Sequence, residues 1–278
     1  MDEIIARLKQ INKDELDERE FYEQVIDVIK GIDASQLSEQ ECESIKSTLH
    51  EIGCEDFEGW IKKKKLLGYA LDDKNLEDSI NKGSLLGGVW FANNMILPYI
   101  SLQGESRSID PAEKKEWAEA WLNNSRKISK NEKQIFDGMI DSIKSIDKSK
   151  LSERRFFEEV LGATLQMKDL DFTEYKHKKL QETLFGIGCE NYKDWEDRHL
   201  AAGEEIPSTL SGAKDAGSLY MGASCINQFL CGYETALLSY EKMIEGGDKH
   251  GSLQQWLRAS KAISAEEEKD TEDEYIDY

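Results

Sequence analysis

Two cysteines with the same neighbours are the first residues of this sequence that could carry out chemistry. Cys54 and Cys189 each follow a glycine in the string Ile-Gly-Cys-Glu. A cysteine just ahead of a helix can have a lowered thiol pKa and act as a nucleophile. Such catalysis also needs a base, and the histidine near the first string, His50, becomes Phe185 near the second. We therefore expect both cysteines to be small buried side chains without a catalytic role.

Glutamates that recur 135 residues apart are a second chemical possibility. They are Glu18, Glu23 and Glu55, with counterparts Glu153, Glu158 and Glu190. Glutamates on helices can bridge metal ions, but such sites need Glu-x-x-His pairs on facing helices. No histidine stands at equivalent positions in the two halves of the chain. We therefore predict no metal site and no cofactor, and expect these glutamates to cap helices or to form structural ion pairs.

These residues belong to an internal repeat that covers most of the chain. Residues 8–60 match residues 143–195 without a gap, and about one position in three is identical. The best blocks are LDEREFYEQV (16–25) against LSERRFFEEV (151–160), and TLHEIGCEDFEGW (48–60) against TLFGIGCENYKDW (183–195). Further on, WLNNSRKIS (121–129) pairs with WLRASKAIS (256–264). The sequence therefore predicts a tandem duplication, with one copy in residues 1–130 and the other in residues 131–265.

Each copy is predicted to be all-α, with about five helices. Only three prolines occur in 278 residues, so helices are rarely interrupted. Asp17 with Glu20 has the spacing of a capping box, as does Ser38 with Glu41. Glycines 53 and 188 stand where a helix often ends in a left-handed residue. These signals bracket the second and third helices of the repeat.

The remaining helices follow from apolar spacing and from one proline. A short amphipathic helix is expected through Phe57 and Trp60, and an uncharged one over about residues 83–102. Asp110 and Pro111 open a further helix, and residues 130–146 should continue it into the second copy. The two copies can pack about a pseudo-two-fold axis or stack as a short solenoid. The sequence does not distinguish these two arrangements.

Two segments without charge, 83–104 and 216–233, raise the question of a membrane span. Their length admits one. Each carries amides near its middle, at Asn93 and at Asn227, and amides are costly in hydrocarbon. We therefore expect central helices of a bundle, with the two asparagines bonded to backbone or to each other.

Charge and cysteine usage limit the partners and the compartment. The formal net charge of −20 disfavours nucleic acids and anionic membranes. The lysine run 62–65 has only a partial echo at 176–179, so it is interpreted as a solvated helix face. The five cysteines show no C-x-x-C spacing, and no secretory leader precedes them. We expect a cytoplasmic protein with reduced thiols and no membrane or direct nucleic-acid partner.

The C-terminal segment 266–278, EEEKDTEDEYIDY, has eight acidic residues and one lysine. It has too little apolar content to fold alone, so disorder is expected. Its functional alternative is an arm that docks on a basic surface. The candidate partner-binding residues are Glu266, Glu267, Glu268, Asp270, Glu272, Asp273, Glu274 and Tyr275.

Three functions are compatible with this sequence. The first, which we favour, is a non-enzymatic protein that covers the surface of a basic partner such as a toxin or effector; bacterial immunity proteins are a functional analogy. The second is a helical enzyme with a site between the two copies, which would need pocket-facing carboxylates with perturbed pKa values. The third is a protein that inserts its uncharged helices into a membrane.

Overall fold

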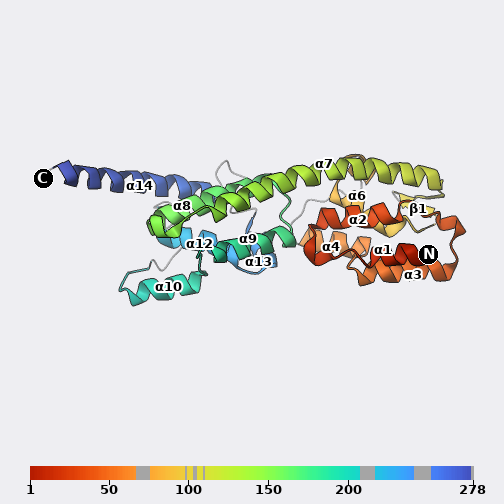
Figure 1. Ribbon diagram of the computed structural model, residues 1–278, viewed down its shortest axis with the longest axis horizontal. Helices are drawn as coiled ribbons and strands as arrows, with labels where there is room; N and C mark the ends of the chain where they lie inside the picture. The colour runs from red at the N-terminus through yellow and green to blue at the C-terminus, as the bar shows by residue number, and fades with distance from the viewer. Residues whose placement is uncertain are drawn as a thin grey trace. The chain divides into compact units, whose positions relative to one another are not determined.

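The chain forms two compact units, Met1–Lys133 and Gln134–Tyr278, in the computed structural model shown in Figure 1. The structure describes residues 1–66, 76–97, 99–102, 105–108, 110–206, 217–240 and 252–276. Within these ranges, side chains are described outside 76–77, 99–102, 105–108, 252 and 268–276. Each unit is considered by itself below.

Unit 1 is helical apart from one short hairpin. Its elements are α1 (Asp2–Leu8), η1 (Lys13–Glu15), α2 (Glu18–Ile29), η2 (Ala34–Gln36), α3 (Glu39–Glu51), α4 (Phe57–Leu66), α5 (Leu76–Asn81), α6 (Leu85–Asn94), β1 (Tyr99–Leu102), β2 (Glu105–Ser108) and the first part of α7 (Pro111–Lys144). The hairpin pairs β1 and β2 antiparallel, with Tyr99 opposite Ser108. The boundary between the units falls inside α7, so the helix predicted to run from one half into the next is confirmed.

Unit 2 repeats much of this order after the last turns of α7. Its further elements are η3 (Lys148–Lys150), α8 (Glu153–Thr164), η4 (Leu165–Asp169), α9 (Glu174–Gly186), α10 (Tyr192–Ala201), α12 (Leu219–Leu230), α13 (Tyr233–Tyr240) and α14 (Ser252–Ile276). Helix α14 extends through most of segment 266–278, for which the sequence predicts disorder. The prediction of an all-α fold is confirmed in both units, with the hairpin as a small addition.

The helix ends follow the local signals in the sequence. Both predicted capping boxes of unit 1 form: Asp17 caps α2 with Glu20, and Ser38 caps α3 with Glu41. Gly53 has φ +96° and Gly188 has φ +88°, the left-handed conformation expected after a helix. Each lets the following cysteine N–H donate to a carbonyl five residues back, Leu49 O or Leu184 O.

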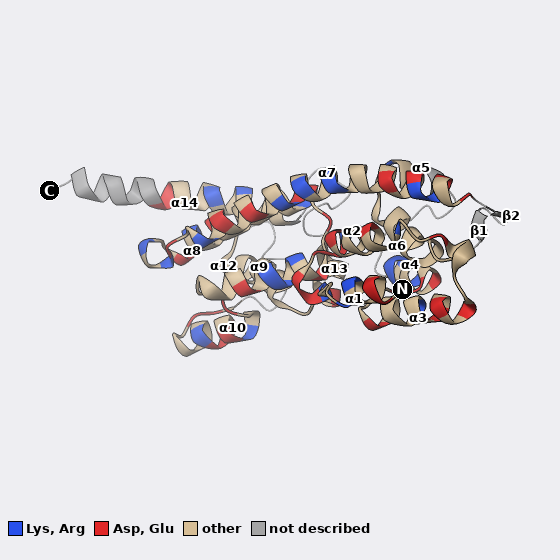
Figure 2. Cartoon of the chain, turned by 45° about the vertical axis from the view of Figure 1, so that its right-hand side comes forward, with Lys and Arg blue, Asp and Glu red and all other residues tan. Residues whose placement is uncertain are grey.

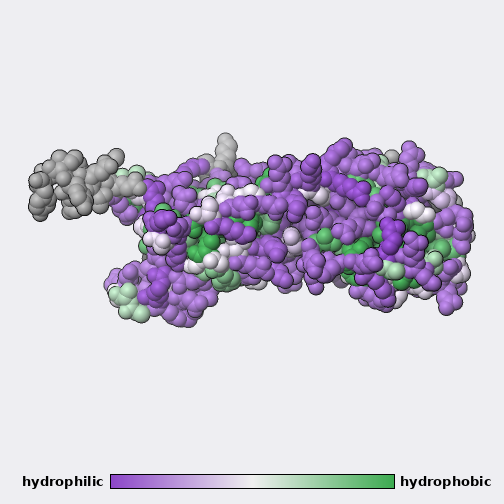
Figure 3. Space-filling model, in the orientation of Figure 1, coloured by the Kyte–Doolittle hydropathy of each residue, from purple (hydrophilic) through white to green (hydrophobic). Residues whose placement is uncertain are grey.

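Apolar side chains from one face of each helix fill the two cores. In unit 1, Phe21, Trp60 and Trp121 are at most 1% exposed. In unit 2, Phe156 and Trp256 are fully buried. The face of the molecule drawn in Figure 3 is mostly hydrophilic, with apolar residues in small separate areas. This pattern is typical of helices that bury one stripe and solvate the other.

The expected uncharged helix over residues 83–102 is wrong in length. Helix α6 spans only Leu85–Asn94, and β1 begins at Tyr99. A proline at position 98 cannot donate a backbone hydrogen bond and disfavours helix before it. The Lys114 ammonium bonds to the carbonyl of Leu97 and lies 3.4 Å from that of Asn94, so it caps this helix end. Among the helices that the structure describes, none is long and apolar enough to cross a membrane.

Candidate functional site

A buried carboxylate joins the second helix of unit 1 to its last helix. Glu23 on α2 is 7% exposed and accepts hydrogen bonds from Ser125 Oγ at 2.7 Å and Ser129 Oγ at 2.5 Å, both on α7. The same contacts recur 135 residues later in unit 2, where Glu158 accepts from Ser260 at 2.7 Å and Ser264 at 2.8 Å. A buried carboxylate costs free energy unless it is hydrogen-bonded. These pairs of hydroxyls supply that compensation, so both glutamates are engaged in holding helices together.

An arginine and a glycine make a second contact of this kind. Arg19 is 6% exposed and donates to the carbonyl of Gly83 at 2.7 Å. The glycine has φ +69°, and a Cβ on it would lie 2.5 Å from the backbone nitrogen of Ser125. In unit 2, Arg154 donates to Gly217 at 2.5 Å, and Gly217 approaches Ser260 as closely. Both glycines are needed because two backbones meet there.

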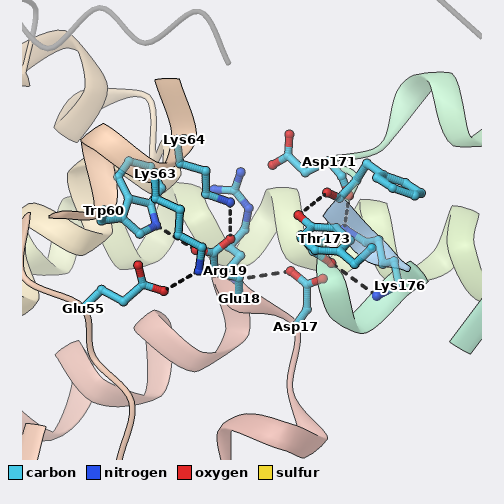
Figure 4. Close-up of polar contacts among 12 residues, drawn as sticks. Asp17, Glu18, Arg19, Glu55, Trp60, Lys63, Lys64, Asp171, Thr173 and Lys176 are labelled. Carbon is cyan, nitrogen blue, oxygen red and sulfur yellow. Dashed lines mark hydrogen bonds and ion pairs between the residues drawn. The ribbon is translucent and has the colours of Figure 1, made fainter. Parts of the chain in front are cut away.

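Figure 4 shows a polar cluster at α4 that the sequence analysis did not identify. The carboxylate of Glu18 accepts from Trp60 Nε1 at 2.7 Å and from Lys64 Nζ at 2.7 Å. Trp60 and Lys64 are the buried residues of α4, one turn apart. The exposed Lys63 turns to Glu55 instead, at 2.9 Å. The lysine run 62–65, predicted to be a solvated face, therefore includes one buried anchor.

The equivalent cluster in unit 2 has a histidine in place of the lysine. His199 Nδ1 lies 2.6 Å from Glu204 Oε2, and Nε2 lies 2.9 Å from Glu153 Oε2. The ring is 5% exposed and packs on Trp195 with centroids 4.2 Å apart. Trp195 Nε1 has no hydrogen-bond partner among the described residues, unlike Trp60. With the histidine covered on one face by tryptophan and held by two carboxylates, the cluster leaves little room for a substrate.

Arg198 completes this second cluster. Its guanidinium contacts Glu190 at 2.6 Å and Glu153 at 2.5 Å, and the hydrogen bond to Glu190 is the main cause that raises its pKa. Arg198 and His199 stand 135 residues after Lys63 and Lys64. The sequence signal was therefore present, but the lysine run was compared with residues 176–179 and its counterpart was missed.

The two cysteines lie where they cannot act as thiolates. Cys54 and Cys189 are 8% and 6% exposed. Burial raises the pKa of each thiol to about 12, although Lys13 and Lys148 act in the opposite direction. Both thiols are therefore neutral at physiological pH.

The remaining candidates divide between engaged residues and residues outside the described side chains. Asn93 donates to the backbone carbonyls of Glu55 and Val89 at 3.1 and 2.9 Å, so its expected backbone bonding is observed. Of the eight candidate partner-binding residues, Glu267 lies 3.6 Å from Arg154 of the same unit. Glu266 is exposed, and the side chains of the other six are outside the described residues. No group of three or more potential metal ligands is found in the described part of the chain.

Comparisons with models of protein families, with curated proteins and with solved structures gave no match. A function for this chain therefore has to be argued from its own residues.

Proposed function

We propose that this chain is a binding protein that covers the basic surface of a protein partner with its own acidic surface. Its net charge of −20 favours cationic partners and accelerates their association at low salt. In this mode the partner loses access to whatever its basic surface normally binds. The proposed partner class is a basic toxin or effector, as in the analogy with immunity proteins.

The observation that carries the proposal is the different placement of two groups of acids. The acids shared by both units, such as Glu23 and Glu158, are buried and bonded to serines. Other acids remain on the surface, as Figure 2 shows along α3. Glu39, Glu43 and Glu51 are exposed there, and Lys46 is the only lysine of that helix. The exposed acids can meet a partner without disturbing the fold.

We also infer that the two units derive from one duplicated domain. In support, the glutamate–serine pairs, the arginine–glycine contacts and the left-handed glycines occur at matching positions in both. The tryptophan indoles match as well: Trp121 Nε1 donates to Ser84 O and Trp256 Nε1 to Ser218 O. The α3 equivalent in unit 2 is α9, where three lysines accompany two glutamates. The acidic α3 surface is therefore a property of unit 1 and a candidate for partner-specific contact.

The test is affinity capture with the full chain from its native host, followed by a salt titration of the recovered complex. We expect a basic protein whose affinity falls at least tenfold between about 50 and about 500 mM salt. The double variant Glu39→Lys/Glu43→Lys should weaken binding more than Glu116→Lys/Glu119→Lys, which changes the charge equally on exposed positions of α7. A complex insensitive to salt, or equal loss in both variants, would contradict the proposal.

A further inference from the structure

A groove of about 590 Å³ lies between the last turns of α7 and helix α9, entirely within unit 2. Its apolar lining residues are Phe136, Ile140, Tyr175 and Ile187. Its charged lining residues are Asp137, Lys144, Lys179 and Glu182. A volume of this size is in the range of ligand-binding sites.

Unit 1 shows how the equivalent place is closed when a carboxylate is present. There Lys9, after α1, forms an ion pair with Glu51 at the end of α3, at 3.3 Å. The residues 135 positions later are Lys144 and Gly186. A Cβ added to Gly186 would meet nothing within 4 Å, so the place of the missing glutamate is open space. The cation has been kept and its internal carboxylate has been lost.

Lys144 is the cation in the groove that is available to a partner. It is exposed and has no ion-pair partner among the described residues. The other charged lining residues already interact: Lys179 lies 3.7 Å from Glu182, and Asp137 has a contact elsewhere. The charge at the Gly186 end of the groove is therefore positive, beside an apolar floor.

We propose that this groove binds a helical segment of a partner protein, which places a carboxylate on Lys144 and apolar side chains on the floor. Phe136, Ile140 and Lys144 follow one another at intervals of four residues, a length of about 12 Å or two helical turns. Side chains four apart on a docking helix match this spacing, as in helix-in-groove recognition. The partner carboxylate takes the position that Glu51 holds in unit 1. The proposal does not depend on the acidic surface of α3.

The probe is a synthetic alanine-based helical peptide with two leucines four residues apart and a glutamate one turn further on. Binding to the full chain is followed by NMR through the methyl groups of Ile140 and Ile187. We expect these methyl signals to shift, and Lys144→Glu to weaken binding about fivefold to tenfold. The same peptide with lysine in place of glutamate should bind Lys144→Glu better than the wild-type chain. Lys127→Glu, an exposed reversal on the same helix, should have no effect.

Gly186→Glu is the most direct test, because it restores the residue of unit 1. The position is exposed with open space around it, so the variant should fold. Its carboxylate should pair with Lys144 and compete with the peptide, which lowers affinity by a similar factor. Methyl signals that do not shift with peptide would overturn the proposal. Equal binding by wild type, Lys144→Glu and Gly186→Glu would overturn it as well.

Discussion

The buried carboxylates of Glu23 and Glu158 are the residues with the clearest energetic role. Each accepts two serine hydroxyls from a helix more than 100 positions later in the sequence. Replacing Ser125 or Ser260 by alanine leaves a buried carboxylate with one donor fewer. We expect a loss of about 1–3 kcal/mol in the free energy of unfolding, measured by urea denaturation.

Ser142→Ala is the matched control for this prediction. Ser142 is exposed on α7 and donates to the carbonyl of Gly138 one turn before it. Its removal should change stability by no more than about 0.5 kcal/mol. If Ser125→Ala and Ser260→Ala were as mild as this control, the carboxylates would not depend on their serine donors.

The cysteines allow a prediction about reactivity. With a pKa of about 12, Cys54 and Cys189 have a thiolate fraction below about one in a thousand at pH 8. Cys42 is only half-buried and should be alkylated first by iodoacetamide. Mass spectrometry of digested protein after timed labelling gives the order. Rapid labelling of Cys54 or Cys189 in the folded protein would contradict the burial of these thiols.

Among the elements, the close approach of the α6 N-terminus to α7 sets a strict steric requirement. A methyl group on Gly83 or Gly217 would overlap a backbone nitrogen and would also face a positive φ. Both Gly83→Ala and Gly217→Ala should cost more than about 2 kcal/mol. Thermal unfolding monitored by circular dichroism measures the effect.

Gly138→Ala provides the opposite expectation on the same helix. Gly138 lies inside α7, and an added Cβ meets nothing within 4 Å. Alanine has the higher helix propensity, so this variant should gain up to about 1 kcal/mol. A loss at Gly138 equal to that at Gly83 would mean that helix α7, and not the close contact, determines both results.

The elements that the sequence predicted are those defined by local signals. The capping boxes of Asp17 and Ser38 and the turns at Gly53 and Gly188 depend on neighbours within a few residues. The hairpin after α6 has no such signal, because apolar residues continue beyond Asn94. The serine donors to Glu23 were also missed, since only tertiary packing brings α2 and α7 together. His199 could have been found, because the constant offset places it opposite Lys64.

For the whole molecule, pH acts through carboxylates as well as through net charge. Hydrogen bonding to Lys30, with a further contribution from Arg126, holds the pKa of Asp27 below 3.8 despite partial burial. Asp27 therefore contributes stability that is present above pH 3.8 and is lost as the pH falls through its folded-state pKa. Asp27→Asn should be less stable than wild type near pH 6, and the difference should shrink toward pH 3.

Urea unfolding at several pH values tests this, because the wild-type and variant chains share the same change in overall charge. A difference in stability that stays constant from pH 6 to pH 3 would show that Asp27 does not act through its ionisation. Neutralising the acidic surface at low pH reduces self-repulsion in both proteins and cancels in the comparison.

The long separation of the glutamate–serine contacts has a consequence for synthesis on the ribosome. The pairs in each unit join residues 102 and 106 positions apart. At a usual elongation rate of 5–20 residues per second, roughly 5–20 s pass between the translation of Glu23 and that of its donors. During this interval α2 has its apolar face and its carboxylate but no closing helix. We expect the nascent first unit to stay open until residue 129 has left the exit tunnel, and then to close in a late step that a ribosome-bound chain ending before Ser125 cannot make.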